Sequence, residues 1–254
     1  MHIRFLFAAC LGLLCLLYPV AARAADFVLL GDLAPDIVQS MRYATPVNFT
    51  GARVPGYETG TCILTRPTAE ALAKVQDQLA AKGFGLVVFD CYRPQRAVTA
   101  FVDWSRKPDI DADPAKRFHA PAVPARRLFA EGYIAERSGH SRGHTVDLGL
   151  IALGTELTPP DALPTEGDCT TTSPSGDALP DMGSSFDCLD ARSWKTAKGL
   201  TSEQRRHRET LRSAMLAAGF RPYDKEWWHF SYPPGDPGKA FDFPVDPDAL
   251  PAAE

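Results

Sequence analysis

The spacing of apolar positions along the chain predicts helices and strands in alternation. Three segments repeat apolar residues at the interval of an amphipathic helix: residues 68–83, 94–104 and 202–219. Three shorter segments are rich in β-branched and aromatic residues, as strands are: residues 85–90, 146–151 and 225–232. Thr68 is expected to cap the first helix and Gly83 to end it. These elements predict a single α+β domain, with helices packed on a mostly antiparallel sheet.

The apolar pattern at the N-terminus differs from the rest. His2 and Arg4 precede an apolar run over residues 5–20, and the small-residue motif of residues 22–24 follows. This order is typical of a secretory signal peptide, so residues 1–24 are expected to be removed and residues 25–254 to form the domain. The alternative is a membrane anchor, but the run is shorter than the ~20 apolar residues a spanning helix needs. The protein is therefore expected to be exported, to the periplasm, without stable membrane insertion.

Two polar segments lack any apolar period. Residues 153–180 are rich in Gly, Pro, Ser, Thr and Asp and predict a long surface loop. Loops of this length are uncommon unless they have a function or are tied down. The tail from Pro233 is rich in Pro and Asp and is expected to wrap the surface.

Charge narrows the choice of partner. The formal net charge is −4, with basic and acidic residues in similar number. That balance gives no sign of the excess positive charge that proteins binding nucleic acid or an anionic membrane usually carry. A small or neutral partner is expected instead.

Cysteines contribute a further constraint. Four of the six lie beyond the signal peptide, an even set that predicts disulfides in an exported protein: Cys62, Cys91, Cys169 and Cys188. None forms a C-x2-C pair, so a cysteine zinc site is disfavoured. A helix followed by an antiparallel return would bring Cys62 close to Cys91, and the other two flank the end of the long loop. The pairs Cys62–Cys91 and Cys169–Cys188 are therefore predicted.

The first chemically informative segment runs from Ser138 to Asp147. His140 and Asp147 flank a glycine-containing turn, and Asp147 lies at the start of an apolar strand. A carboxylate on a buried strand is costly unless it is paired or binds a metal, and imidazole with carboxylate suits Zn²⁺. The alternative is a turn-capping aspartate beside a surface histidine.

A second segment contains Glu226 and His229 in the sequence Glu-Trp-Trp-His. His229 would complete a set of three ligands with one open position, and Glu226 would act as general base. Residues three apart face opposite sides of an ideal strand, so a bulge, twist or strand end is expected here. The alternative is an aromatic core strand with a buried structural histidine.

A third segment, Asp90 to Pro94, follows a buried strand. Arg93 at that strand end could stabilise an oxyanion, with Asp90 holding the guanidinium in place. A purely structural ion pair is the alternative.

Together these segments resemble the D-Ala-D-Ala dipeptidases, a family of zinc metallopeptidases that includes the vancomycin-resistance dipeptidase. The resemblance rests on S-x-H-x-x-G-x-x-x-D at residues 138–147, E-W-W-H at 226–229 and D-x-Y-R-P at 90–94. It extends over residues 35–245 through further matching segments in the same order: residues 43–45, 48–51, 55–58, 92–98, 182–187 and 241–244.

The resemblance implies a role for each residue of these motifs. One zinc ion would be bound by His140, Asp147 and His229. Glu226 would be the catalytic base and Arg93 would stabilise the transition state. The remaining two assignments rest on resemblance alone: Asp187 would meet the free amino group of a small dipeptide, and Ser138 would line the pocket. The implied reaction is hydrolysis of D-Ala-D-Ala.

Departures from the family pattern leave alternatives open. Gly139 and His144 are unusual at their positions, and His144 is a second histidine beside the ligands, expected on the pocket wall or exposed. The loop 153–180 is longer than the family leads one to expect, which puts the exact substrate in question. The competing functions are a zinc D,D- or L,D-carboxypeptidase acting on longer peptidoglycan stems and a non-catalytic module that binds wall peptides.

Overall fold

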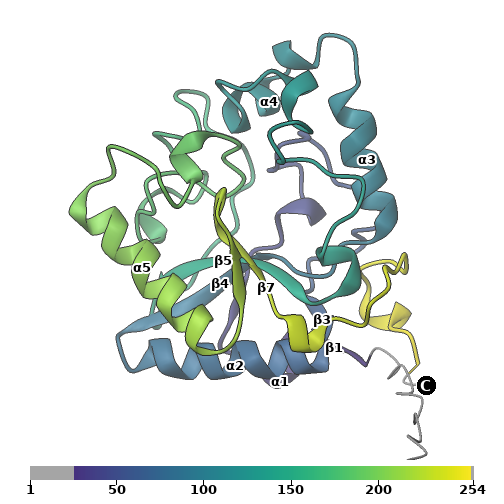
Figure 1. The fold of residues 1–254 in the computed structure, drawn as a ribbon, viewed down its shortest axis with the longest axis vertical. Helices are drawn as coiled ribbons and strands as arrows, with labels where there is room; N and C mark the ends of the chain where they lie inside the picture. The colour runs from purple at the N-terminus through teal and green to yellow at the C-terminus, as the bar shows by residue number, and fades with distance from the viewer. Residues whose placement is uncertain (1–25, 253–254) are drawn as a thin grey trace, which may run out of the picture.

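The computed structural model describes residues 26–252 and has a central five-stranded sheet (Figure 1). The strand order is β2 (Val38–Gln39), β4 (Phe84–Asp90), β5 (Thr145–Ala152), β7 (Glu226–Ser231) and β6 (Arg221–Tyr223). Only β2 and β4 pair in parallel, and the other neighbours in this sheet are antiparallel. Two more strands, β1 (Phe27–Leu29) and β3 (Ile63–Thr65), form a separate antiparallel pair. The predicted α+β domain with a mostly antiparallel sheet is confirmed.

Helices lie on both sides of this sheet. The described helices are α1 (Leu30–Leu33), α2 (Arg66–Ala80), α3 (Gln95–Ser105), α4 (Pro114–His119) and α5 (Ser202–Ala217). Helices α2 and α5 contact the sheet on one side, whereas α3, α4 and long connections lie on the other (Figure 1). Among residues 26–252, no helix has both the length and the apolar character to cross a bilayer.

The two faces of the sheet bury different cores. Leu86 and Val88 of β4 pack with Leu72 of α2 and Leu211 of α5 in an aliphatic layer. The residues that alternate with them along β4, such as Phe89, belong to a second core that is rich in aromatic rings. This division follows from the alternation of side chains along a strand. The second face carries the polar groups described below.

The predicted helix boundaries need correction at α2. The helix begins at Arg66 with Thr65 as its N-cap, so Thr68 lies inside the first turn and is not the cap. Pro67 explains the earlier start, because proline is well tolerated in a first turn where its missing N–H has no partner to lose. Gly83 lies beyond the end of the helix at a φ of 80°, a conformation that suits glycine. By contrast, α5 begins where predicted, with a capping box that joins Thr201 and Gln204.

The two polar segments behave differently from one another. Residues 153–175 contain neither helix nor strand, as expected of a long loop, and a single 3₁₀ turn follows at Gly176–Ala178. The tail from Pro233 packs into the body: Val245 is fully buried and forms an isolated bridge with Tyr57. The proposed signal peptide, residues 1–24, lies outside the described residues.

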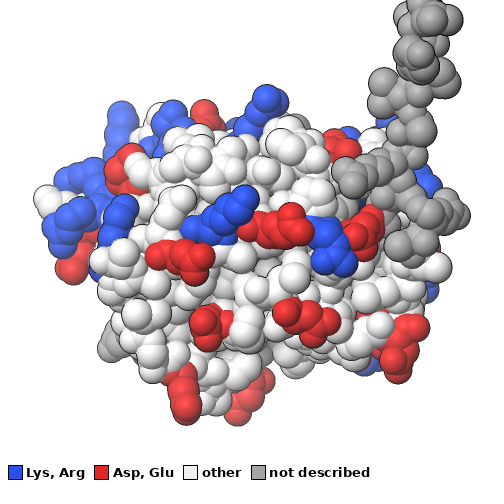
Figure 2. All heavy atoms as spheres, turned by 90° about the horizontal axis from the view of Figure 1, so that it is seen from below, with Lys and Arg blue, Asp and Glu red and all other residues white. Residues whose placement is uncertain are grey.

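Acidic and basic side chains are mixed on the surface beneath α2. Figure 2 shows this face with both signs interspersed rather than gathered into one continuous patch. The distribution agrees with the small net charge of −4. A surface of this kind gives little long-range attraction to a highly charged partner.

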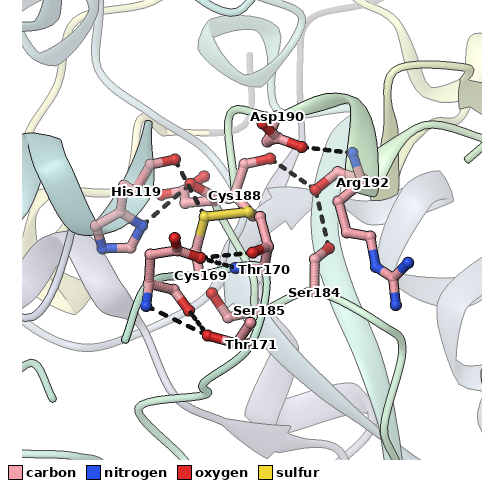
Figure 3. The surroundings of a disulfide bond; sticks show 12 residues. His119, Cys169, Thr170, Thr171, Ser184, Ser185, Cys188, Asp190 and Arg192 are labelled. Atoms are coloured by element: carbon pink, nitrogen blue, oxygen red, sulfur yellow. Dashed lines mark hydrogen bonds between the residues drawn. A yellow bond between two sulfur atoms is a disulfide. The ribbon is translucent and has the colours of Figure 1, made fainter. Parts of the chain in front are cut away.

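Both predicted disulfides are present. Cys62 and Cys91 have a Cα separation of 5.3 Å, and Cys169 and Cys188 one of 5.2 Å. The second bond lies beside His119 at the end of α4 (Figure 3). The backbone N–H of Cys169 donates to the carbonyl of Phe118, and that of Leu189 donates to the carbonyl of His119. The long loop is thereby tied to the segment that contains Asp187.

Removing the second disulfide should weaken both stability and substrate binding. The bond closes a loop with a sequence separation of 19 residues. A loop of that size corresponds to about 3 kcal/mol of stabilisation through restriction of the unfolded chain. Replacing Cys169 and Cys188 by serine is therefore expected to lower the free energy of unfolding by about this amount. If Asp187 meets the substrate as the family resemblance implies, KM should also rise, because the bond holds the segment that contains Asp187. Denaturant unfolding and steady-state kinetics would measure the two effects, and unchanged stability would contradict the prediction.

Candidate active site

Three neighbouring strands place polar side chains in one row. Asp147 of β5 pairs with His229 of β7 on one side and with Asp90 of β4 on the other. The β4–β5 register is irregular between Val88 and Asp90, which brings the two aspartates opposite each other. The β6–β7 register is also irregular where Tyr223 pairs with Glu226, as predicted from the spacing of Glu226 and His229. These irregularities allow both ends of the Glu-Trp-Trp-His motif to reach one site.

His140 comes from a 3₁₀ turn (His140–Arg142) that precedes β5. Its Nδ1 lies 2.7 Å from the carbonyl oxygen of Cys91, so Nδ1 carries the proton and Nε2 presents a lone pair. A Cβ on Gly139 would lie 2.4 Å from Oγ1 of Thr145, so the turn has no room for a side chain there. The glycine that looked unusual in the sequence therefore avoids a clash with the Thr145 hydroxyl.

The three predicted ligands converge. Nε2 of His140 lies 3.3 Å from Asp147 Oδ2 and 3.4 Å from Nδ1 of His229, and that Nδ1 lies 3.0 Å from Asp147 Oδ1. One ligand atom from each residue can be chosen so that all lie within 4.8 Å of one another. Asp147 Oδ1 is buried and accepts no well-aligned hydrogen bond, although Nδ1 of His229 lies 3.0 Å away. Two imidazole nitrogens and an unsatisfied buried carboxylate oxygen fit a divalent cation such as zinc.

Electrostatics within the cluster favours an ionised Asp147. Burial alone would raise the pKa of this carboxyl, but His140 and His229 outweigh it and hold the pKa well below its usual range. The hydrogen bond from His140 to Cys91 fixes the ring in the orientation that a metal ligand needs. The cluster thus has its acceptor atoms aimed inward.

Glu226 lies beside the cluster, with Oε2 3.5 Å from Nδ1 of His229. Burial is the main cause that raises the pKa of Glu226 to about 8, and the charge of Asp147 is the second. A cation bound by the cluster would lower that pKa, because an opposite charge favours the ionised form. A carboxylate in this position can accept a proton near neutral pH and later release it.

Arg93 is fixed by Asp90, as the sequence predicted. Its Nε and Nη2 lie 2.9 and 2.8 Å from Asp90 Oδ2, and Nη2 lies 3.5 Å from Asp147. The hydroxyl of Tyr57 donates to the other oxygen of Asp90 at 2.6 Å. The guanidinium also lies over the rings of Tyr43 and Phe101. Arg93 is therefore held rigidly with part of its side chain, 13 % exposed, facing the cavity.

Several of these groups border one cavity of about 300 Å³, whereas His140 and Asp90 are not among the residues that line it. The predicted residues that line it are Arg93, Ser138, Asp147, Asp187, Glu226 and His229. Asp187 adopts a left-handed backbone conformation, with φ at 57°, and accepts a hydrogen bond of 2.8 Å from the hydroxyl of Tyr43. Burial, together with the charge of Asp147, raises the pKa of Asp187 well above its usual range. A ligand cation would restore its negative charge.

His144 does not belong to this site. It is 4 % exposed, does not line the cavity, and its Nε2 lies 3.7 Å from Asp236. The expectation that it lies on the pocket wall or at the surface is therefore wrong. Positions 144 and 147 have opposite parity along an extended chain, which turns the two side chains to different sides.

Sequence reasoning assigned no role to three residues that support the site. Tyr43 and Tyr57 donate to Asp187 and Asp90, and both stand in segments that carried the family resemblance. His119 lies 3.0 Å from the backbone carbonyl of Asp187 through Nδ1. No motif surrounds His119, so nothing in the sequence signalled its contact with a residue 68 positions away.

Comparison with known proteins agrees with this geometry. The family model described as "D-ala-D-ala dipeptidase" matches residues 23–246. The chain belongs to the D-Ala-D-Ala dipeptidase family. Three D-alanyl-D-alanine dipeptidases illustrate the similarity, from Enterococcus faecium (35 % identity), Enterococcus faecalis (37 %) and Streptomyces coelicolor (37 %). The alignments cover 86, 80 and 87 % of this chain and 98, 90 and 98 % of those proteins, respectively.

Membership of the dipeptidase family establishes that the chain is a peptidase. The matched region includes every residue of the cluster, the cavity and both disulfides. The candidate active site, the cavity over β5 and β7, therefore lies within the region that matches the family.

Proposed function

We propose that this protein is a zinc-dependent dipeptidase that hydrolyses D-Ala-D-Ala to two molecules of D-Ala in peptidoglycan metabolism. The observation that carries the proposal is the convergence of His140, Asp147 and His229 beside Glu226 and Arg93. A structural metal site would have no need of a buried carboxylate poised at its edge. The non-catalytic wall-peptide module is therefore disfavoured.

Each residue then has a chemical task. Zinc held by the three ligands would lower the pKa of a bound water to about 7. Glu226 accepts the proton of the attacking water and passes it to the leaving amine. Arg93 donates hydrogen bonds to the oxyanion that develops on the scissile carbonyl, and loss of such a donor commonly costs ~10²–10³-fold in rate. Asp90 and Tyr57 keep the guanidinium in position.

Asp187 provides the preference for a dipeptide. Its carboxyl lines the same cavity as Glu226 and is held by Tyr43, so it can pair with the ammonium group of a free N-terminus. Ser138 lines that cavity as well. A carboxypeptidase acting on stem peptides would need an open path where Asp187 lies. The dipeptidase is therefore the preferred function.

Export is the remaining part of the proposal. Two disulfides favour an oxidising compartment, since such bonds rarely persist in the cytosol. The signal-peptide pattern of residues 1–24 adds independent support. We therefore place the enzyme in the periplasm.

A substrate panel tests the activity and the role of Asp187 together. The panel consists of D-Ala-D-Ala, L-Ala-L-Ala, N-acetyl-D-Ala-D-Ala and a stem pentapeptide, each with and without chelator. We expect chelator-sensitive cleavage of D-Ala-D-Ala and little cleavage of the acetylated form. Asp187→Asn should raise KM for the free dipeptide about 10–100-fold, because a hydrogen bond to a charged group contributes ~1.5–3 kcal/mol. The acetylated dipeptide serves as the matched control, since it has no ammonium group to lose.

Two outcomes would count against this proposal. Faster cleavage of the pentapeptide than of the dipeptide would favour the carboxypeptidase. Equal cleavage of free and acetylated dipeptides would remove Asp187 from substrate recognition.

A further inference from the structure

A second cavity, of about 510 Å³, lies on the same face of the sheet as the active-site cavity. Gly149 lines it and is two residues from Asp147 on β5, so both positions face the same side. The other walls come from the disulfide-tied loop and the segment that leads to Asp187. The volume falls within the range of small-molecule sites, about 300–1,000 Å³.

The two cavities lie back to back. They share no lining residue, yet at three places consecutive residues line opposite cavities. Arg42, Phe186 and Trp227 line the second cavity. Their neighbours in the sequence, which are Tyr43, Asp187 and Glu226 respectively, line the active-site cavity. The wall between them is therefore one residue thick at these points.

Arg42 brings a positive charge into the second cavity. The residue is 5 % exposed, its Nη2 donates to Ser175 Oγ at 2.7 Å, and its guanidinium lies 5.5 Å from the ring centroid of Phe89. Its Nε is buried without a hydrogen-bond partner, and none of the ion pairs among the described side chains includes it. Burial lowers the pKa of Arg42 to about 10 despite the charge of Asp187. A buried cation in this state is unfavourable until an anion reaches it.

His119 brings a hydrogen-bond acceptor to the same cavity. Its Nδ1 donates to the carbonyl of Asp187, so Nε2 has a free lone pair. That Nε2 is buried without a partner, and the residue is 3 % exposed. Burial, with a further contribution from Arg42, lowers the pKa of His119 to about 4, so the ring is neutral. Figure 3 shows the imidazole beside the disulfide that ties down the loop.

We propose that the second cavity binds a small carboxylate that also carries a hydrogen-bond donor, the chemical class of free amino acids. The carboxylate would accept hydrogen bonds from Arg42, and the amino group would donate to His119 Nε2. Such a ligand offers a partner to both side chains, whereas a simple anion offers one only to Arg42. Because Arg42 Nε and His119 Nε2 are almost fully buried in this structure, the side chains around them must shift as the ligand binds. Because His119 also holds the carbonyl of Asp187, occupancy would steady the residue that the proposed function assigns to substrate recognition; this consequence alone rests on that function.

Calorimetry on chelator-treated protein tests the proposal, because a carboxylate cannot then bind a metal in the active site. The probes are D-alanine, L-alanine, acetate, ethylamine and inorganic phosphate. We expect one equivalent of either alanine to bind, at least tenfold more tightly than acetate or phosphate, and ethylamine to give no signal. Arg42→Met should weaken alanine binding at least tenfold, and Arg42→Lys less. Arg93→Met is the matched control, since it removes the arginine of the other cavity and should leave this binding intact.

Amide chemical shifts keep the test independent of how well the variants fold. In wild-type protein, alanine should perturb Gly149, Thr171 and Ser184, which line the second cavity, more than Ser138 and Gly139 of the active site. Perturbations confined to the active site, or binding lost in Arg93→Met and kept in Arg42→Met, would overturn the proposal. Equal binding of acetate or phosphate would overturn the amino-acid assignment. None of these results depends on dipeptidase activity, so failure of the proposed function would be seen separately in the substrate panel.

Discussion

Replacing His229 with alanine is expected to abolish both zinc binding and hydrolysis. His229 is one of the three side chains of the cluster, and its Nδ1 lies 3.0 Å from an Asp147 oxygen to which it makes no well-aligned hydrogen bond. Loss of a partner that merely orients a ligand already costs about 10–100-fold in metal affinity or activity. Loss of a ligand itself should therefore cost more than about 100-fold in affinity. Elemental analysis after gel filtration, combined with a D-Ala-D-Ala assay, measures both effects.

His144→Ala provides the matched control for that experiment. It removes an imidazole from the same motif, but one that lies beside Asp236 and does not line the cavity. This variant should keep one zinc per chain. Full zinc occupancy in His229→Ala would rule out the ligand set, and loss of zinc in both variants would point to a general loss of structure.

The longer elements of the fold could be predicted because their side-chain pattern is local. Helix α5 has a capping box and apolar positions on one face, and β4 and β5 are buried along most of their length. Strands β1, β2, β3 and β6 are only two or three residues long, too short to establish a period. They exist because partners distant in the sequence supply their hydrogen bonds, as when β1 pairs with β3. Their positions follow from tertiary contacts that composition does not encode.

The candidate site also has parts that the sequence could predict and parts that it could not. His140, Asp147, Glu226 and His229 could be proposed from residue type and spacing, since imidazole and carboxylate are what a zinc peptidase needs. The contacts that support these residues could not be predicted, because they join segments that are distant in the sequence. Tyr43, for example, donates a hydrogen bond to Asp187, which lies 144 positions away. The second cavity was equally inaccessible to sequence reasoning. Its walls combine Arg42, a β5 glycine and a loop without periodic pattern, which only the folded chain brings together.

Glu226→Gln is expected to retain the fold and the zinc ion while losing several orders of magnitude in kcat. Glutamine keeps the size of the side chain and can occupy the same place beside His229, but it cannot accept a proton from water at neutral pH. In the proposed reaction one carboxylate serves two proton transfers, and each such transfer typically contributes 10²–10⁴-fold. The loss should therefore appear in kcat, with a smaller effect on KM.

Zinc content and the pH profile distinguish this role from a structural one. Burial and the charge of Asp147 favour the protonated form of Glu226 by raising its pKa. Because a base must lose its proton before it can act, wild-type kcat/KM should rise with pH through the pKa of Glu226 in the free metal-loaded enzyme. That rise should disappear from whatever activity Glu226→Gln retains. Glu209→Gln, an exposed position on α5, is the control and should leave activity and profile unchanged. A Glu226→Gln enzyme with full zinc and a tenth or more of wild-type kcat would show that another residue is the base, and among the groups lining the cavity Asp187 would be the next to test.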